Sequence, residues 1–300
     1  MNIQQVAIVS VPFGKGAGTP GAELGPAHIL HAADLERKLA ELNISYRLAG
    51  EVSVSSPLPP LQAANAKNLS EVHEISNRLS ERVSEIVAEN AFPLVLGGDH
   101  SISIGTIAGL AEHYANLGVI WFDAHSDLNT EDTSPSGNIH GMSLGISLGR
   151  GIPLLTGIRG ISPKIKPEHV AIVGARSLDS GEKAYIRSLG IACYTMHDID
   201  RIGIARVMEK VIGRFKQITD GVHVSFDIDS LDPREAPGTG TPVRGGLSYR
   251  EAHLALELLY QSDLVTSAEF VEVNPSLDQN DQTAKLAVEL IGSLLGEQIL

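Results

Sequence analysis

Cysteine is nearly missing from this sequence: the 300 residues include one, Cys193. A single thiol excludes an internal disulfide framework and a zinc site built from cysteines. A chain of this length buries about 75% of the surface that its unfolded form exposes, so it can fold without such cross-links. Cys193 stands in an apolar run, and we expect it to be a buried hydrophobic residue.

Positive charge and long apolar runs are also scarce. Lysine and arginine number 23 against 36 acidic residues, a net charge of −13, which argues against nonspecific binding to nucleic acid or to an anionic membrane. No apolar run approaches the roughly 20 residues of a membrane helix. The first residues lack the basic start and the small-residue cleavage site of a signal peptide. We therefore expect a cytoplasmic globular protein, and its charge is compatible with a cationic small-molecule substrate.

Short β-branched runs alternate with longer amphipathic stretches along the chain. The runs predict strands at residues 6–11, 94–96, 119–122, 170–173, 191–194, 222–228 and 265–271. The amphipathic stretches predict helices at residues 27–42, 69–89, 103–114, 181–189, 202–215, 249–260 and 283–295. Ser70, before Glu71, and Ser248, three residues before Glu251, are the expected helix caps.

This alternation is typical of an α/β fold with a mostly parallel sheet covered by helices on both faces. No low-complexity linker divides the chain, and the proline-rich piece 55–60 reads as a short surface loop. We expect one domain over residues 1–300.

Three of the predicted strands end in acidic clusters, where sheets of this kind bind their ligands. FPLVLGGDH (92–100) ends in His100, after two glycines that allow a sharp turn. VIWFDAHSD (119–127) carries polar residues at alternate positions, about 6.6 Å apart and on one face where the chain stays extended. VHVSFDIDSLDP (222–233) sets aspartates and His223 on the parity opposite to its apolar residues.

One such cluster alone is more often a structural turn than a binding site, but three together predict a metal centre. The candidate ligands are His100, Asp123, His125, Asp127, Asp227 and Asp229. Four buried carboxylates would be balanced by two divalent cations. Carboxylate with some imidazole and no thiolate favours Mn²⁺, and ligand type leaves zinc, iron and cobalt open. Two ions about 3.5–4 Å apart can share a water and lower its pKa, which implies attack of hydroxide on an electrophilic carbon or phosphorus.

The motifs that contain these residues resemble those of the ureohydrolase family. They are GGDHSISIGT (97–106), WFDAHSDLNTEDTSPSGNIHGM (121–142) and SFDIDSLDP (225–233). Segments 127–130 and 134–140 resemble arginases in particular, and the similarity continues through GTGTPVRGGLSYRE (238–251) and SAEFVEVNP (267–275). The resemblance implies an eight-stranded parallel sheet, two Mn²⁺ ions per subunit, and a trimer or hexamer. It also implies hydrolysis of L-arginine to L-ornithine and urea by a metal-bridging hydroxide.

The resemblance also implies roles for individual residues. Asp123 and Asp227 match bridging ligands, and Asp127 matches a catalytic ligand. His140 matches the proton-transfer histidine, and Glu272 matches the carboxylate that pairs with the guanidinium, which it can hold by charge-assisted hydrogen bonds. The matches on the substrate side are Asn129, Ser136 and Asn138 for the α-carboxylate, Asp179 and Glu182 for the α-amino group, and Thr241 as a supporting hydroxyl.

The sequence departs from arginases at three places on the substrate side. Ser126 replaces the usual Gly or Thr, Ser143 replaces the usual Pro, and segment 14–26 lacks the basic residues common there. An agmatinase, guanidinobutyrase or formiminoglutamase is therefore the alternative hydrolase, and a sensor that binds guanidino compounds without cleaving them is a third hypothesis. The nucleophile-elbow pattern at 141–145 follows no convincing strand and is interpreted as accidental.

Overall fold

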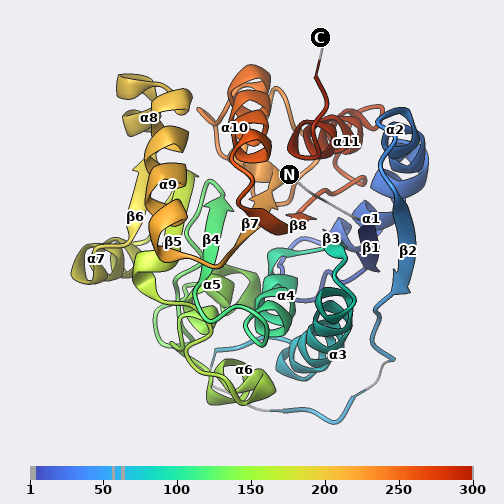
Figure 1. Ribbon diagram of the computed structural model, residues 1–300. Helices are drawn as coiled ribbons and strands as arrows, with labels where there is room; N and C mark the ends of the chain where they lie inside the picture. Colours follow the sequence, from blue (N-terminus) through green and yellow to red (C-terminus); the bar gives the residue numbers. More distant parts are fainter. Residues whose placement is uncertain (1–4, 56–57, 62–64, 299–300) are drawn as a thin grey trace.

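A sheet of eight parallel strands forms the centre of the computed structural model, which describes residues 5–55, 58–61 and 65–298 (Figure 1). The strand order is β2-β1-β3-β8-β7-β4-β5-β6. The strands are β1 (Val6–Val11), β2 (Tyr46–Glu51), β3 (Phe92–Gly97), β4 (Leu117–Phe122), β5 (Val170–Ala175), β6 (Ala192–Thr195), β7 (Gly221–Asp227) and β8 (Val265–Val271). This architecture confirms the predicted fold class.

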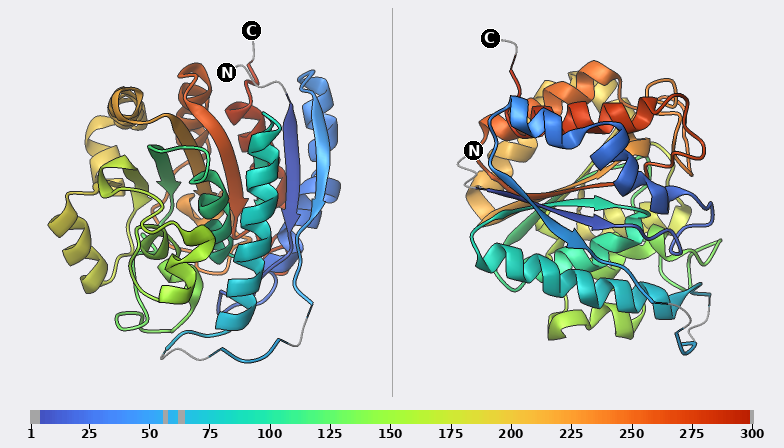
Figure 2. Two further views of the ribbon diagram at one scale, coloured as in Figure 1. Left: turned by 60° about the horizontal axis from the view of Figure 1, so that its bottom comes forward. Right: turned by 90° about the vertical axis from the view of Figure 1, so that its right-hand side faces the viewer.

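Helices cover both faces of the sheet, as Figure 2 shows. One face packs against α2 (Leu35–Glu41), α8 (Met196–Ile202), α9 (Ile204–Ile218), α10 (Tyr249–Gln261) and α11 (Gln282–Leu294). The other packs against α3 (Leu69–Ala88), α4 (Ser103–Leu110), α5 (Ser143–Ser147), α6 (Pro153–Thr156) and α7 (Ser180–Leu189). The three-residue α1 (Gly25–Ala27) follows β1. Within the described part of the chain, no helix is both long and apolar enough to span a membrane.

Alternate residues of each central strand contribute to two separate apolar cores. On β1, Val6 and Ile8 belong to the core beneath α9–α11, whereas Ala7 and Val9 belong to the core beneath α3 and α4. Burial of both faces explains why these strands are continuous apolar runs in the sequence. The expected alternation on β7 is confirmed for its apolar residues: Val222, Val224 and Phe226 all lie in the first core.

Some local predictions were wrong. The helix expected over 27–42 is interrupted at Asp34, whose φ of 61° is left-handed, and α2 begins only after it. The edge strand β2 was missed because its sequence, YRLAGE, is half exposed and lacks a β-branched run.

Of the two expected helix caps, one is confirmed. Ser248 accepts from the Glu251 amide at 3.4 Å, and Glu251 accepts from the Ser248 amide at 2.9 Å. The other was wrong, because α3 begins at Leu69 and the Ser70 hydroxyl donates to the Pro59 carbonyl at 2.8 Å.

The turn after β3 lies directly against the backbone that follows β1. The Gly98 amide donates to the Val11 carbonyl at 3.0 Å, and the Asp99 amide donates to the Phe13 carbonyl at 2.8 Å. A Cβ on Gly98 would lie 1.9 Å from the Phe13 carbonyl oxygen. Only glycine fits there, and this close approach fixes where His100 leaves the sheet.

We predict that Gly98→Ala destabilises the protein, because the backbone after β1 would have to move. The expected loss is about 1–3 kcal/mol or more, as for other overpacked sites. The midpoint of urea unfolding measures it. The matched control is Gly213→Ala on the exposed side of α9, where nothing lies within 4 Å of the added Cβ. It should gain up to about 1 kcal/mol of helix propensity. Equal stability of the two variants would contradict the prediction.

Candidate metal centre

Four neighbouring strands deliver the predicted ligands and Glu272 to one edge of the sheet. The strands β3, β8, β7 and β4 are adjacent in that order, and all run parallel. Their carboxyl ends therefore meet, although the segments are far apart in the sequence. His100 follows β3, Asp123 follows β4, Asp227 ends β7, and Glu272 follows β8.

Two groups of side chains at this edge are close enough to hold a metal ion each. One consists of His100, Asp123 and Asp227, and the other of Asp123, His125 and Asp229. The two oxygens of Asp123 face different imidazoles, Oδ2 at 3.3 Å from Nδ1 of His100 and Oδ1 at 3.3 Å from Nδ1 of His125. Asp123 is therefore shared by both groups.

Asp127 joins the centre through a turn rather than an extended strand. Strand β4 ends at Phe122, and Asp127 has a left-handed φ of 50°. The chain therefore does not stay extended to this residue, and the condition for a shared face with Asp123 and His125 is not met. The turn nevertheless brings Oδ2 of Asp127 to 3.2 Å from Nδ1 of His100.

The donor set fits divalent cations. Burial and the charges of neighbouring carboxylates raise the pKa of Asp127 and Asp227 well above the ordinary aspartate value. Nδ1 of His100 lies 3.0 Å from Asp227 and 3.3 Å from Asp123, yet it has no hydrogen-bond partner among the described residues. Nδ1 of His100 and the carboxylate oxygens of Asp123 and Asp227 thus lie close together with no hydrogen bond between them. A divalent cation bound between these atoms would give each of them a partner.

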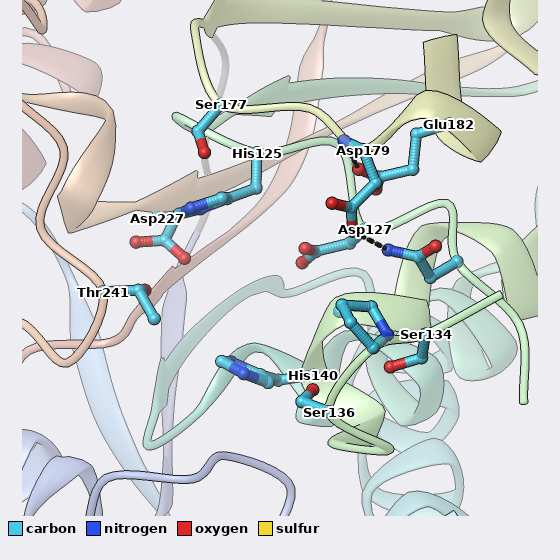
Figure 3. Close-up of a pocket in the computed structure, with 13 residues that line it drawn as sticks. His125, Asp127, Ser134, Ser136, His140, Ser177, Asp179, Glu182, Asp227 and Thr241 are labelled. Atoms are coloured by element: carbon cyan, nitrogen blue, oxygen red, sulfur yellow. Dashed lines mark hydrogen bonds between the residues drawn. The ribbon is translucent and has the colours of Figure 1, made fainter. Parts of the chain in front are cut away.

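A pocket of about 600 Å³, open to solvent, borders these groups (Figure 3). The predicted site residues that line it are His125, Asp127, Asn129, Ser136, His140, Asp179, Glu182, Asp227 and Thr241. Asn138 and Glu272 do not line it. Ser134 and Ser177 also line the pocket, and neither was predicted as a site residue. Ser177 follows the end of β5 at the same edge of the sheet, and this position is the signal that could have revealed it.

Glu272 lies behind His140. Its Oε1 accepts from the His100 amide and from Nδ1 of His140, both at 2.9 Å. Burial lowers the pKa of His140, but the hydrogen bond and charge of Glu272, with the charges of Asp127 and Asp99, outweigh burial and raise the pKa to about 9. His140 is therefore protonated at neutral pH and fixed in orientation by its carboxylate partner.

Glu182 holds the far wall of the pocket together. Its Oε1 accepts from the Ser126 hydroxyl at 2.8 Å and from the Leu128 amide at 3.1 Å, and its Oε2 accepts from the Asp179 amide at 2.8 Å. These bonds tie the loop after β4 to the start of α7. On the same wall, the Asn129 amide group donates to Asp179 at 2.9 Å, so Asn129 is itself held in place.

Two further residues support the site, Thr241, which was predicted, and Asp99, which was not. The Thr241 hydroxyl donates to Oδ2 of Asp229 at 2.9 Å. Asp99, which received no role from the sequence, accepts from the Gly16 amide at 2.7 Å and from the Ala17 amide at 3.2 Å. It thereby anchors segment 14–26. Its position directly after Gly97 and Gly98 is the feature of the sequence that could have indicated this supporting role.

Two histidines outside the candidate ligand set, His223 and His28, have structural partners. His223 is fully buried and lies 2.9 Å from the Ser267 hydroxyl, away from both metal-ligand groups. His28 pairs with Asp281 at 3.0 Å.

Cys193 is partly buried rather than fully buried, and burial raises the pKa of its thiol to about 12.

Comparison with known proteins gives similarity over nearly the whole chain. Residues 4–296 match the model of the arginase family. The arginase of Bacillus caldovelox is 52% identical over 300 residues, covering 99% of this chain and 100% of that protein. The arginase of Bacillus subtilis is 50% identical over 295 residues, covering 98% and 99%. The native structure of the Bacillus caldovelox arginase superposes with a TM-score of 0.96 at 51% identity, covering 99% and 100%.

We predict that substitutions in the two ligand groups have unequal effects on metal content. Asp123→Asn removes a carboxylate common to both groups, so it should reduce binding from about two ions per chain to less than one. His125→Asn removes a ligand of one group only and should leave about one ion. Elemental analysis after dialysis against Mn²⁺ measures both. Two ions in either variant would contradict this arrangement.

Proposed function

The chain belongs to the arginase family, and from this premise we propose that it hydrolyses L-arginine to L-ornithine and urea with two Mn²⁺ ions. It is a ureohydrolase by its full-length similarity to bacterial arginases. One observation above all supports L-arginine as the substrate. The pocket has an anionic end at the shared Asp123 centre and a polar wall at Asn129, Ser136 and Asp179, so it offers separate partners to the two ends of arginine.

The ions would be held by the residues that converge at the sheet edge. We assign them to His100, Asp123, His125, Asp127, Asp227 and Asp229, with Asp123 shared. Oxygen-rich ligands with imidazole and no thiolate suit Mn²⁺. The chemistry that such a pair supplies when bound is acidification of water near neutral pH.

The guanidinium group belongs at the anionic end of the pocket. It is planar and carries five N–H donors, so carboxylates can orient it by charge-assisted hydrogen bonds. In the described residues, hydrogen bonds to the Glu272 carboxylate reach only Oε1, which leaves Oε2 for the substrate. We propose that Glu272, which lies behind the residues that line the pocket, reaches the guanidinium with Oε2 and holds His140 beside it with Oε1.

His140 is the proposed proton donor to the departing amine. The imidazole lines the pocket, and its partner Glu272 raises its pKa to about 9. The protonated ring can therefore release a proton from Nε2 to the departing amine of ornithine as the bond between that nitrogen and the guanidinium carbon breaks. Meanwhile Nδ1 keeps its hydrogen bond to Glu272. Water restores the proton before the next turnover.

The opposite wall accounts for the proposed preference for an amino acid. Agmatine differs from L-arginine by the absence of the α-carboxylate. Asn129 and Ser136 offer polar groups at this wall, and Asp179 offers a carboxylate for the α-ammonium group. A substrate without the α-carboxylate would leave polar groups of the wall without a partner, which costs binding energy.

We predict that urea release by the Mn²⁺-loaded protein is fastest with L-arginine in a panel that includes agmatine, 4-guanidinobutyrate and canavanine. The value of kcat/KM for L-arginine should exceed that for agmatine by roughly 10²-fold or more, because the missing carboxylate leaves its partners unpaired. Ser136→Ala should reduce this ratio by lowering kcat/KM for L-arginine alone. Preference for agmatine would overturn the substrate assignment and favour the agmatinase alternative. Release of urea from none of the four, with metal bound, would favour formimino substrates or a sensor.

We predict that His140→Ala keeps both ions but slows turnover. His140 lies outside both ligand groups, so elemental analysis should still find about two ions per chain. The expected loss in kcat is about 10²–10⁴-fold, as for removal of a general acid. Full activity in this variant would remove the proton-transfer role.

A further inference from the structure

A row of buried polar side chains lies beneath His100, on the side away from the pocket. Nε2 of His100 is 2.8 Å from the Ser225 hydroxyl, and that hydroxyl donates to Oε1 of Glu269 at 2.7 Å. Ser225 and Glu269 are directly paired in register on β7 and β8. All three side chains are essentially inaccessible to solvent, and the mechanism proposed above uses neither Ser225 nor Glu269.

Glu269 sets the direction of the hydrogen bonds in this row. The Ser225 hydroxyl donates to Oε1 of Glu269 at 2.7 Å, and Nε2 of His223 lies 3.4 Å from the same oxygen. Oε1 therefore accepts within this row, and a carboxylate can only accept hydrogen bonds. The one hydroxyl proton of Ser225 is therefore committed to Glu269, and the Ser225 oxygen is left to accept.

This direction decides which nitrogen of His100 carries a proton. Because Ser225 accepts, Nε2 of His100 is the donor. Nδ1 faces the aspartate oxygens, at 3.0 Å from Asp227 and 3.2 Å from Asp127. The ring is also stacked on Trp121, with centroids 4.0 Å apart and planes 6° apart. Stacking fixes the plane of the ring, and the bond to Ser225 fixes its rotation within that plane.

We propose that Glu269 is a positioning residue for metal binding, which acts through Ser225 to keep the proton of His100 on Nε2 and the lone pair of Nδ1 directed at the His100-side ion. The proposal rests on the metal-binding part of the proposed function. Loss of a hydrogen-bond partner behind a metal ligand typically lowers metal affinity 10–100-fold. The effect is specific to one ion, because His125 has no contact with this row in the described structure.

Glu269→Met tests the proposal, because it removes the acceptor and keeps an unbranched side chain of similar length. The Ser225 hydroxyl then becomes free to donate to Nε2 of His100. Titration of Mn²⁺ against a competing chelator should show one of the two ions bound about 10–100-fold more weakly and the other within twofold of wild type. Ser225→Ala, which deletes the intermediate hydroxyl, should have the same selective effect and serves if Glu269→Met does not fold.

Ser267→Ala is the matched control. Like Ser225→Ala, it removes one buried serine hydroxyl. The hydroxyl of Ser267, however, contacts His223 at 2.9 Å on the far side of Glu269. Both ions should bind to this variant within about twofold of wild type, because the bond from Ser225 to Glu269 is intact.

A spectroscopic measurement separates positioning from a general loss of structure. In Cd²⁺-loaded protein with ¹⁵N-labelled histidine, the Nε2–H resonance of His100 should move upfield in Glu269→Met as its hydrogen bond weakens, and it should stay in place in Ser267→Ala. The His125 resonance is an internal reference that should not move. Equal weakening of both ions, or unchanged affinity with an unmoved His100 resonance, would overturn the proposal. Selective weakening of one ion supports it even in a protein that releases no urea.

Discussion

The burial of three aspartates around a fourth, the shared Asp123, is the constraint on which the rest of this site depends. Asp123 is 1% exposed, and each of its oxygens has a donor: Trp121 Nε1 at 2.9 Å on Oδ2 and the His125 amide at 2.6 Å on Oδ1. These donors hold its position but do not neutralise its neighbours. Charges of one sign at such short range require cations, and the proposed ions would supply them.

Backbone conformations near the centre carry part of the energetic cost of this arrangement. Asp127 and Glu272 are both left-handed, with φ of 50° and 64°, and such residues cost of order 1–3 kcal/mol each. The surrounding structure fixes them: the Gly145 amide donates to the Asp127 carbonyl at 3.0 Å, and the Glu272 amide donates to the Gly98 carbonyl at 2.7 Å. Each turn directs a carboxylate toward the centre, where an ordinary strand-to-loop continuation would direct it elsewhere.

The two serines that depart from the family pattern act behind the pocket rather than on its surface. Neither lines the pocket. Ser126 donates to Glu182 at 2.8 Å, and Ser143 donates to the His140 carbonyl at 2.9 Å. They support the two walls between which the substrate would lie. Their structural roles explain how the sequence can differ there while the pocket keeps its polar residues.

Features that depend on neighbouring residues could be predicted from the sequence. The strand that ends in GGDH, the alternation along β7 and the capping box at Ser248 follow from local pattern and local hydrogen bonding. The tertiary structure decided what depends on contacts across the chain. The sheet order sets β8 between β3 and β7, and only this order brings Glu272 to His140, 132 residues earlier in the chain. The sharing of Asp123 and the link from Glu269 to His100 arise in the same way, because both depend on the alignment of strands distant in sequence.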